Sequence, residues 1–261
     1  MIVLAQVCLW FLRFAVGACV FSFLNVVIYR FPLGESVVRG RSRCMECGRV
    51  LTGAELIPCV SFVMQRGRCK GCGEKIPLRH LFMELAGGAA FCGCSLCFGR
   101  GAWGLVSARG LTAFAFLGIL AVIAWIDWDR KMIYDQFPAM IAFLGAVALW
   151  LFPEHGLTDR LIGSVVVALP MLLLAFAVNG AFGGGDIKLM AAGGFFLGWR
   201  SILVAMLIGL VTGAVYCVFM LWKGRMARKD SFAFGPFLAA GLTVALFWGD
   251  MLADWYLAVL R

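Results

Sequence analysis

Two acidic side chains at the ends of apolar segments could perform acid–base chemistry. Asp127 follows an apolar run that ends at Ile126, and Asp186 follows three consecutive glycines, Gly183 to Gly185. A charge held near hydrocarbon is costly unless it is paired or wetted, so such residues suggest a functional site. Two carboxyl groups that meet could share one proton and hold a water, one as base and the other as acid. This is the arrangement of aspartic proteases, but the two residues alone do not fix the reaction.

The same residues also allow two other interpretations. Asp127 could be one of several paired interfacial charges, together with Asp129, Asp135, Arg130 and Lys131. The glycines could then form a tight turn or a helix-packing surface, and Lys188 could simply extend to the interface. Alternatively, both aspartates could relay protons in a transporter, although a relay favours acidic residues near mid-membrane and these two lie at segment ends.

Four of the 11 cysteines form two Cys-x-x-Cys pairs with a spacing close to that of a zinc ribbon. Cys44 and Cys47 form the first pair, Cys69 and Cys72 form the second, and a glycine follows each pair. Glycine permits the turn that aims two thiolates at one tetrahedral ion. Because four thiolates leave no open coordination position, we expect a structural zinc ion. Two disulfides are the alternative, which a reducing cytoplasm would disfavour.

Three further cysteines form a weaker cluster: Cys92, Cys94 and Cys97. Small thiols of this kind usually pack against neighbouring side chains. We therefore expect a packing role for them rather than a metal or a disulfide.

The composition places these residues in a membrane protein. Apolar residues make up 63% of the 261 residues and charged residues 14%, which exceeds what one soluble core could bury. We expect an all-α, polytopic membrane helical bundle with about eight spans. The candidate spans are 3–29, 81–98, 109–126, 137–152, 161–178, 201–222 and 235–258, with a weaker one at 187–199. Segments 137–152 and 187–199 are short for the bilayer.

The segment between the first two spans differs from the rest of the chain. Residues 30–80 are polar, basic and rich in Gly and Cys, and about 50 residues can build little core without a metal or a disulfide. The sequence therefore predicts three parts. These are a first transmembrane span (1–29), a cytoplasmic zinc-binding domain (30–80) and a membrane helical bundle (81–261).

The basic residues predict the orientation. If 30–80 is cytoplasmic, alternation of the spans places most of the 23 Lys and Arg residues inside, including Arg228 and Lys229, and leaves Arg160 and Arg200 outside. The N-terminus is then outside. The net charge of +9 is explained by topology and by attraction to anionic lipids, so we expect membrane lipids and no nucleic acid as partners.

Taken together, these features resemble the type IV prepilin peptidase family, the GxGD membrane aspartyl proteases that process type IV pilins and type II secretion pseudopilins. The resemblance covers nearly the whole chain. It rests on residues 22–30 (SFLNVVIYR), both cysteine pairs, 55–58 (ELIP), 66–69 (RGRC), 84–85 (EL), 183–188 (GGGDIK) and 234–237 (FGPF). The chain departs from the family pattern at Ile133-Tyr134, where an Ile-Pro or Leu-Pro pair is usual, and at Phe21, where Gly is common.

The resemblance implies a function and roles for named residues. Asp127 matches the first catalytic aspartate and Asp186 the aspartate of the GxGD motif, whereas Asp129 and Asp135 do not match. The implied substrate is a prepilin or pseudopilin, with a short basic leader before a hydrophobic helix. It would be cut at the cytoplasmic face of the bacterial inner membrane.

Methylation of the new N-terminus with S-adenosylmethionine is implied by resemblance alone, because no glycine-rich nucleotide motif is visible. A zinc-ribbon adaptor that binds a partner through residues 30–80 and does no chemistry is a further alternative. No pattern predicts an oligomeric state or separates pilins from pseudopilins as substrates.

Overall fold

The computed structural model describes residues 2–99, 106–178, 180, 182–225 and 232–259, so Arg228 and Lys229 lie outside the described part. Within these residues the chain is helical, and its only extended pairing consists of two isolated single-residue bridges. The predicted all-α class is therefore confirmed. The chain forms two compact units, Met1–Phe114 and Ala115–Arg261. The finer division at residues 29 and 80 stays a prediction.

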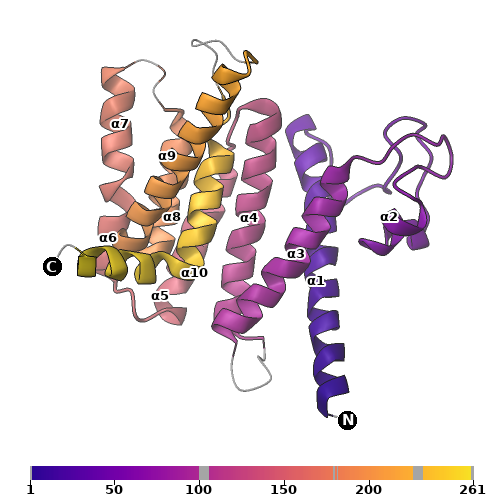
Figure 1. Ribbon diagram of the computed structural model, residues 1–261, viewed down its shortest axis with the longest axis horizontal. Helices are drawn as coiled ribbons and strands as arrows, with labels where there is room; N and C mark the ends of the chain where they lie inside the picture. Colours follow the sequence, from indigo (N-terminus) through magenta and orange to yellow (C-terminus); the bar gives the residue numbers. More distant parts are fainter. Residues whose placement is uncertain (1, 100–105, 179, 181, 226–231, 260–261) are drawn as a thin grey trace. The chain divides into compact units, whose positions relative to one another are not determined.

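The first unit combines a pair of long helices with a cysteine-rich lobe (Figure 1). α1 (Ile2–Arg30) packs along α3 (Leu78–Phe98), and the lobe between them contains α2 (Val60–Met64) and the 3-10 turns η1 (Phe31–Leu33) and η2 (Gly53–Leu56). A side chain at Gly17 would overlap the backbone of Gly87, and one at Gly88 would overlap the ring of Phe14. Small residues therefore let α1 and α3 approach closely, as is usual for helices in lipid.

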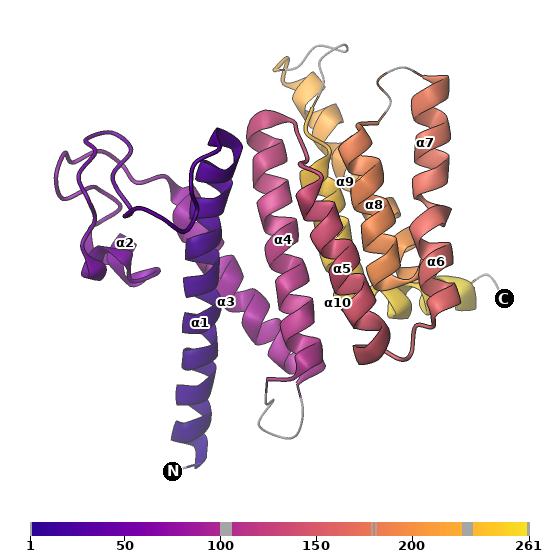
Figure 2. The same ribbon diagram turned by 180° about the vertical axis from the view of Figure 1, so that it is seen from behind.

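The second unit is a helical bundle (Figure 2). α4 (Ala108–Arg130) continues into it from the first unit, followed by α5 (Gln136–Leu151), α6 (Leu157–Val166), α7 (Ala168–Ala177), α8 (Gly184–Leu197), α9 (Trp199–Trp222) and α10 (Gly235–Val259). α8 is the central helix, because it contacts α5, α6, α7, α9 and α10. Its residues Leu189 and Met190 are fully buried. Because its neighbours hold α8 in place, this helix can fix the position of the residues in its first turn.

Six helical segments of the described chain are long and apolar enough to cross a membrane, fewer than the eight or so expected. They are Val3–Leu33, Leu78–Phe98, Ala108–Arg130, Leu157–Ala177, Trp199–Trp222 and Gly235–Val259. The two short segments predicted as spans are α5, with 16 residues, and α8, with 14 residues. At about 1.5 Å per residue they are shorter than the roughly 30 Å of hydrocarbon. The fourth span is interrupted between α6 and α7, where Pro170 lacks the N–H that a continuous helix would need.

Arg160, one of the basic residues expected on the outer side, is fully buried and connects three helices. Its Nε donates to the carbonyl of His155 at 3.1 Å, and its Nη2 donates to Ala148 and Phe152 at 3.2 and 3.3 Å. Its Nη1 donates to the carbonyls of Phe195, at 3.2 Å, and Phe196. These carbonyls belong largely to the C-terminal ends of α5 and α8, which carry partial negative charge. The guanidinium therefore donates hydrogen bonds to backbone carbonyls at the C-terminal ends of both α5 and α8.

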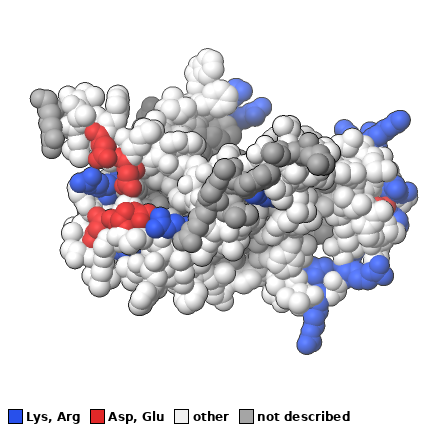
Figure 3. Space-filling view, turned by 90° about the horizontal axis from the view of Figure 1, so that it is seen from below, with Lys and Arg blue, Asp and Glu red and all other residues white. Residues whose placement is uncertain are grey.

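Charged side chains also gather at the surface of this end of the bundle (Figure 3). The imidazole of His155 lies between the carboxylates of Asp159, at 3.1 Å, and Asp250, at 3.2 Å. Arg200 pairs with Asp254 at 3.1 Å, and both side chains are exposed. The hydrogen bonds of Arg160 are thus buried, whereas those of Arg200 are exposed to solvent.

This difference predicts unequal effects of two matched substitutions. Arg160→Met should lower the thermal unfolding midpoint in detergent strongly, because it leaves buried carbonyls without donors, at a cost of about 1–3 kcal/mol each. Arg200→Met should have a small effect, since an exposed pair contributes at most about 1 kcal/mol. Thermal unfolding of both variants is the measurement. Equal midpoints would show that the Arg160 hydrogen bonds contribute little.

Candidate active site

Asp127 lies near the C-terminal end of α4 and is only 5% exposed. Its Oδ2 accepts a hydrogen bond of 2.8 Å from the backbone N–H of Gly235. Gly235 is the first residue of α10, so its N–H is one of the donors that a helix start leaves without an intrahelical partner. The N-terminus of α10 also carries partial positive charge, which favours a carboxylate. The hydrogen bond and the helix end therefore offset part of the cost of burying this carboxylate.

The contact between Asp127 and α10 requires glycine at position 235. A Cβ atom built on Gly235 would lie 2.8 Å from Oδ2 and 3.0 Å from Cγ of Asp127. Such distances are too short for carbon in contact with a carboxylate, so a side chain there would displace Asp127. Gly235 belongs to the FGPF segment, and this close approach is the physical reason for a glycine there.

Asp186 lies in the first turn of α8, where it also accepts a backbone hydrogen bond. The N–H of Gly183 donates to its Oδ2 at 3.3 Å. A Cβ built on Gly185 would lie 2.7 Å from Cβ of Ile133, whereas one on Gly184 would meet no atom within 4 Å. The close packing of the glycine run against the segment before α5 thus depends on Gly185. The side chain of Asp186 is half-buried.

The two carboxyl groups affect each other electrostatically. Asp186 lies outside the six candidate spans. Burial and, to a smaller extent, the negative charge of Asp127 raise the pKa of Asp186 to about 6. The hydrogen bond from Gly183 acts in the opposite direction and lowers this pKa. Like charges that are close disfavour joint ionisation, so the negative charge of Asp127 makes Asp186 harder to ionise. Asp186 therefore keeps its proton up to a higher pH than a solvent-exposed aspartate does.

The other two acidic residues of this region have different surroundings. Asp129 is exposed on the last turn of α4. Both carboxylate oxygens of Asp135 accept hydrogen bonds of 2.7 Å from Nζ of Lys188. This exposed ion pair connects the start of α5 with the second turn of α8. Lys188 thus bonds to a protein carboxylate.

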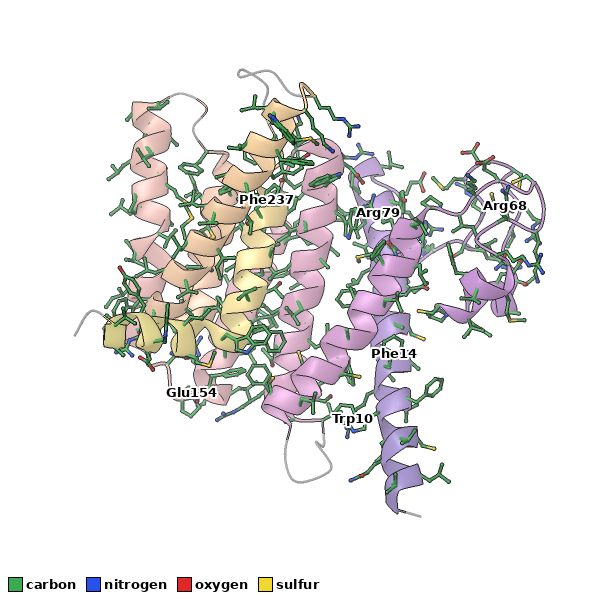
Figure 4. The ribbon with its side chains drawn as sticks, in the orientation of Figure 1. Trp10, Phe14, Arg68, Arg79, Glu154 and Phe237 are labelled. Carbon is green, nitrogen blue, oxygen red and sulfur yellow. The ribbon has the colours of Figure 1, made fainter. Side chains whose placement is uncertain are left out.

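Aromatic rings that come from scattered positions in the sequence lie at this end of the bundle. They are Trp128, Phe182, Tyr216, Phe232, Phe234 and Phe237. Ring centroids are 5.9 Å apart for Phe182 and Phe234, and 5.2 Å apart for Tyr216 and Phe237. Phe237 lies toward the opposite end of the bundle from Glu154 (Figure 4). Only the FGPF motif hinted at this cluster, because its other members are scattered along the chain.

The first unit contains a separate set of ligand atoms. The sulfur atoms of Cys44, Cys47, Cys69 and Cys72 all lie within 4.8 Å of one another, and those of Cys44 and Cys72 are 3.9 Å apart. A tetrahedral zinc ion with Zn–S bonds of about 2.3 Å would separate its sulfurs by about 3.8 Å. The four thiols therefore fit one such ion.

Backbone bridges and glycines shape both cysteine pairs. The bridges join Arg43 to Val50 and Arg68 to Lys75, so each pair lies in a closed turn. Gly48 has a φ of 69° and Gly73 a φ of 74°, left-handed values that favour glycine. The glycine after each cysteine pair thus forms the turn that the sequence predicts.

A buried glutamate supports the cysteine lobe. Glu55 accepts hydrogen bonds of 2.9 Å from both the backbone N–H and the hydroxyl of Thr52, and it pairs with Arg49. These partners lower the pKa of Glu55 to about 2, so it is ionised at any physiological pH. Arg49 in turn packs over Gly71, within 3.0 Å of where a Cβ would lie. The ELIP segment therefore fixes the side chain that covers the second cysteine pair.

Comparisons with known proteins agree with these features. Residues 15–98 match the model of the bacterial peptidase A24 N-terminal domain, and residues 114–218 match that of the type IV leader peptidase family. A relative from Bacillus subtilis, a prepilin leader peptidase/N-methyltransferase, is 32% identical over 94% of this chain and 96% of its own. Relatives of the same name are 36% identical in Myxococcus xanthus, over 80% of this chain and 62% of theirs, and 32% identical in Burkholderia pseudomallei, over 91% and 85%. No solved structure matches the chain. Since both family models and full-length relatives match, the chain belongs to the type IV leader peptidase family.

Proposed function

We propose that the protein is a prepilin leader peptidase and N-methyltransferase of the bacterial inner membrane, and that Asp127 and Asp186 hydrolyse the leader peptide bond. Family membership and the names of the relatives support the activity. The single observation that supports the residue roles is the pair of interacting carboxyl groups in the second unit, one of them held by the N-terminus of α10.

The environments of the two aspartates suggest their roles in hydrolysis. Asp127, stabilised as the carboxylate by the N–H of Gly235, takes a proton from a water between the two groups. The water oxygen attacks the carbonyl carbon of the scissile bond. Asp186, whose raised pKa favours the protonated form, gives its proton to the leaving nitrogen as the C–N bond breaks. The proton that Asp127 gained then restores the shared-proton state.

The surroundings of the pair suit a prepilin or pseudopilin. The aromatic cluster defined above offers apolar surface to the hydrophobic helix that follows the leader. A proton-relay transporter is disfavoured by the position of both aspartates at helix ends rather than in mid-helix.

The membrane arrangement follows from the spans and the basic residues. Six candidate spans support a multi-pass protein in contact with lipid. We infer that residues 30–80 are cytoplasmic and the N-terminus is outside, because this orientation places most Lys and Arg residues inside. Cleavage would then occur at the cytoplasmic face.

Zinc and S-adenosylmethionine are the proposed cofactors. The four cysteine thiols would hold one structural zinc ion, whose coordination they complete. S-adenosylmethionine would supply the methyl group for the N-terminus that cleavage exposes, a proposal that rests on the names of the relatives.

Substitution of each aspartate tests the peptidase assignment. Asp127→Asn and Asp186→Asn should each lower cleavage by at least about a hundredfold, because an amide cannot exchange the shared proton. Asp129→Asn, two residues from Asp127, is the control and should retain most activity. The measurement is shortening of a prepilin by membranes that contain equal amounts of each variant. Full cleavage by either of the first two variants would refute the assignment.

Metal analysis tests the zinc site. The purified protein should contain about one zinc per chain, and Cys44→Ser or Cys72→Ser should lose it. Cys19→Ser, which removes an exposed thiol outside the cluster, should keep the metal. Zinc loss should loosen the lobe before the helices, since such lobes depend on metal for folding energy. Zinc-free wild-type protein with four reactive thiols would contradict the proposal.

A further inference from the structure

An amide without a hydrogen-bond partner is buried in α1. Asn25 is 2% exposed, and among the described residues neither its Oδ1 nor its Nδ2 has a partner. Burial of an unsatisfied amide costs free energy, so such a group usually has a ligand or an ordered water. Leu24 and Val26 beside it show that this helix accommodates apolar side chains. The orphaned amide therefore points to a binding role.

A buried carboxylate belongs to the same helix pair. Glu84, in the second turn of α3, is 9% exposed. Its Oε1 accepts the hydroxyl hydrogen of Ser22 at 2.8 Å, and its Oε2 accepts the backbone N–H of Cys59 at 2.7 Å. Ser22 precedes Asn25 by three residues on α1, a spacing that places them on one face of the helix. Glu84 and Asn25 therefore belong to one polar region between α1 and α3.

The backbone beside this region is strained. Cys59 has a φ of 60°, in the left-handed range that residues other than glycine rarely adopt. Its N–H is the group that Glu84 binds, so the carboxylate helps to hold the lobe against α3 in this conformation. Strain of this kind is frequent at functional sites.

We propose that Ser22, Asn25 and Glu84 form the site at which the free α-amino group of the cleaved chain is bound and methylated. This inference rests on the proposed N-methyltransferase function and deepens it. Asn25 Oδ1 and the Glu84 carboxylate are acceptors suited to an ammonium group, and Asn25 Nδ2 can donate to the first peptide carbonyl. The closed cysteine cluster offers no open position for this task.

The chemistry balances with S-adenosylmethionine as methyl donor. An α-amino group has a pKa of about 8 and is mostly protonated at neutral pH. Glu84 accepts one of its protons, and the freed nitrogen lone pair attacks the sulfonium methyl. The carbon–sulfur bond breaks, and its electron pair stays on sulfur as a neutral thioether. The product is a methylammonium, and Glu84 then releases its proton.

A peptide that begins at the mature N-terminus separates methylation from cleavage. Full-length protein in detergent is given this peptide and S-adenosylmethionine, and methylation is followed by mass. Cleavage of intact prepilin is measured in parallel. Glu84→Gln should lower methylation by about a hundredfold or more, as loss of a general base does. Asn25→Leu should lower it by at least about tenfold, and both variants should cleave normally. Ser95→Ala, whose hydroxyl donates to the backbone carbonyl of Phe91 in its own helix, is the control.

Two further readouts exclude a merely structural role. Methylation by Glu84→Gln should recover as pH rises above the α-amino pKa of about 8, because the amine then needs no base. Asn25→Leu should unfold at the same or a higher temperature than wild type, since it removes an unpaired buried amide.

Three results would overturn the inference: normal methylation in either variant, a pH profile of Glu84→Gln parallel to wild type, or joint loss of methylation and thermal stability in Asn25→Leu. The peptidase proposal is judged separately. Wild-type protein that neither cleaves nor methylates would refute the proposed function itself.

Discussion

The hydrogen bond from the N–H of Gly235 to Asp127 is the contact on which the candidate active site depends. A carboxylate that is only 5% exposed at the end of a membrane span needs a partner, and the start of α10 provides one. The contact joins the end of α4 to the start of α10 and excludes a side chain at position 235. It also fixes the start of α10, which carries Phe237 and follows Phe234 directly. One backbone donor thus holds the Asp127 carboxylate beside the helix start that contributes Phe237 to the aromatic cluster.

Local sequence patterns were sufficient to predict much of this structure. The four cysteine ligands follow from two short spacings with a glycine after each pair, and the structure brings their sulfurs within 4.8 Å. Apolar runs predicted the helices and the approximate bounds of α5 and α8, but they overestimated the spans because these two short helices were counted among them. Asp127 and Asp186 stood out through their position at the ends of apolar runs.

The remaining features depend on residues far apart in the sequence. Arg160 was counted among the outer basic residues, yet it is buried because carbonyls from two other helix ends converge on it. Lys188 binds Asp135, and Glu84 binds Ser22 and Cys59, through contacts that no spacing rule contains. The two proposed chemistries use residues of different units, with amine methylation in the first and peptide hydrolysis in the second. Substitutions can therefore change the residues proposed for one reaction without changing those proposed for the other.

The most direct test of the central contact is cleavage of a prepilin by Gly235→Ala, compared with Gly156→Ala. Gly156 precedes α6 much as Gly235 begins α10, but a side chain at position 156 would meet no atom within 4 Å. Displacement of the Asp127 carboxylate by the added methyl group should lower cleavage by Gly235→Ala about a hundredfold. Gly156→Ala should cleave like wild type. Wild-type cleavage by Gly235→Ala, at equal protein levels, would show that the start of α10 does not position Asp127 for catalysis.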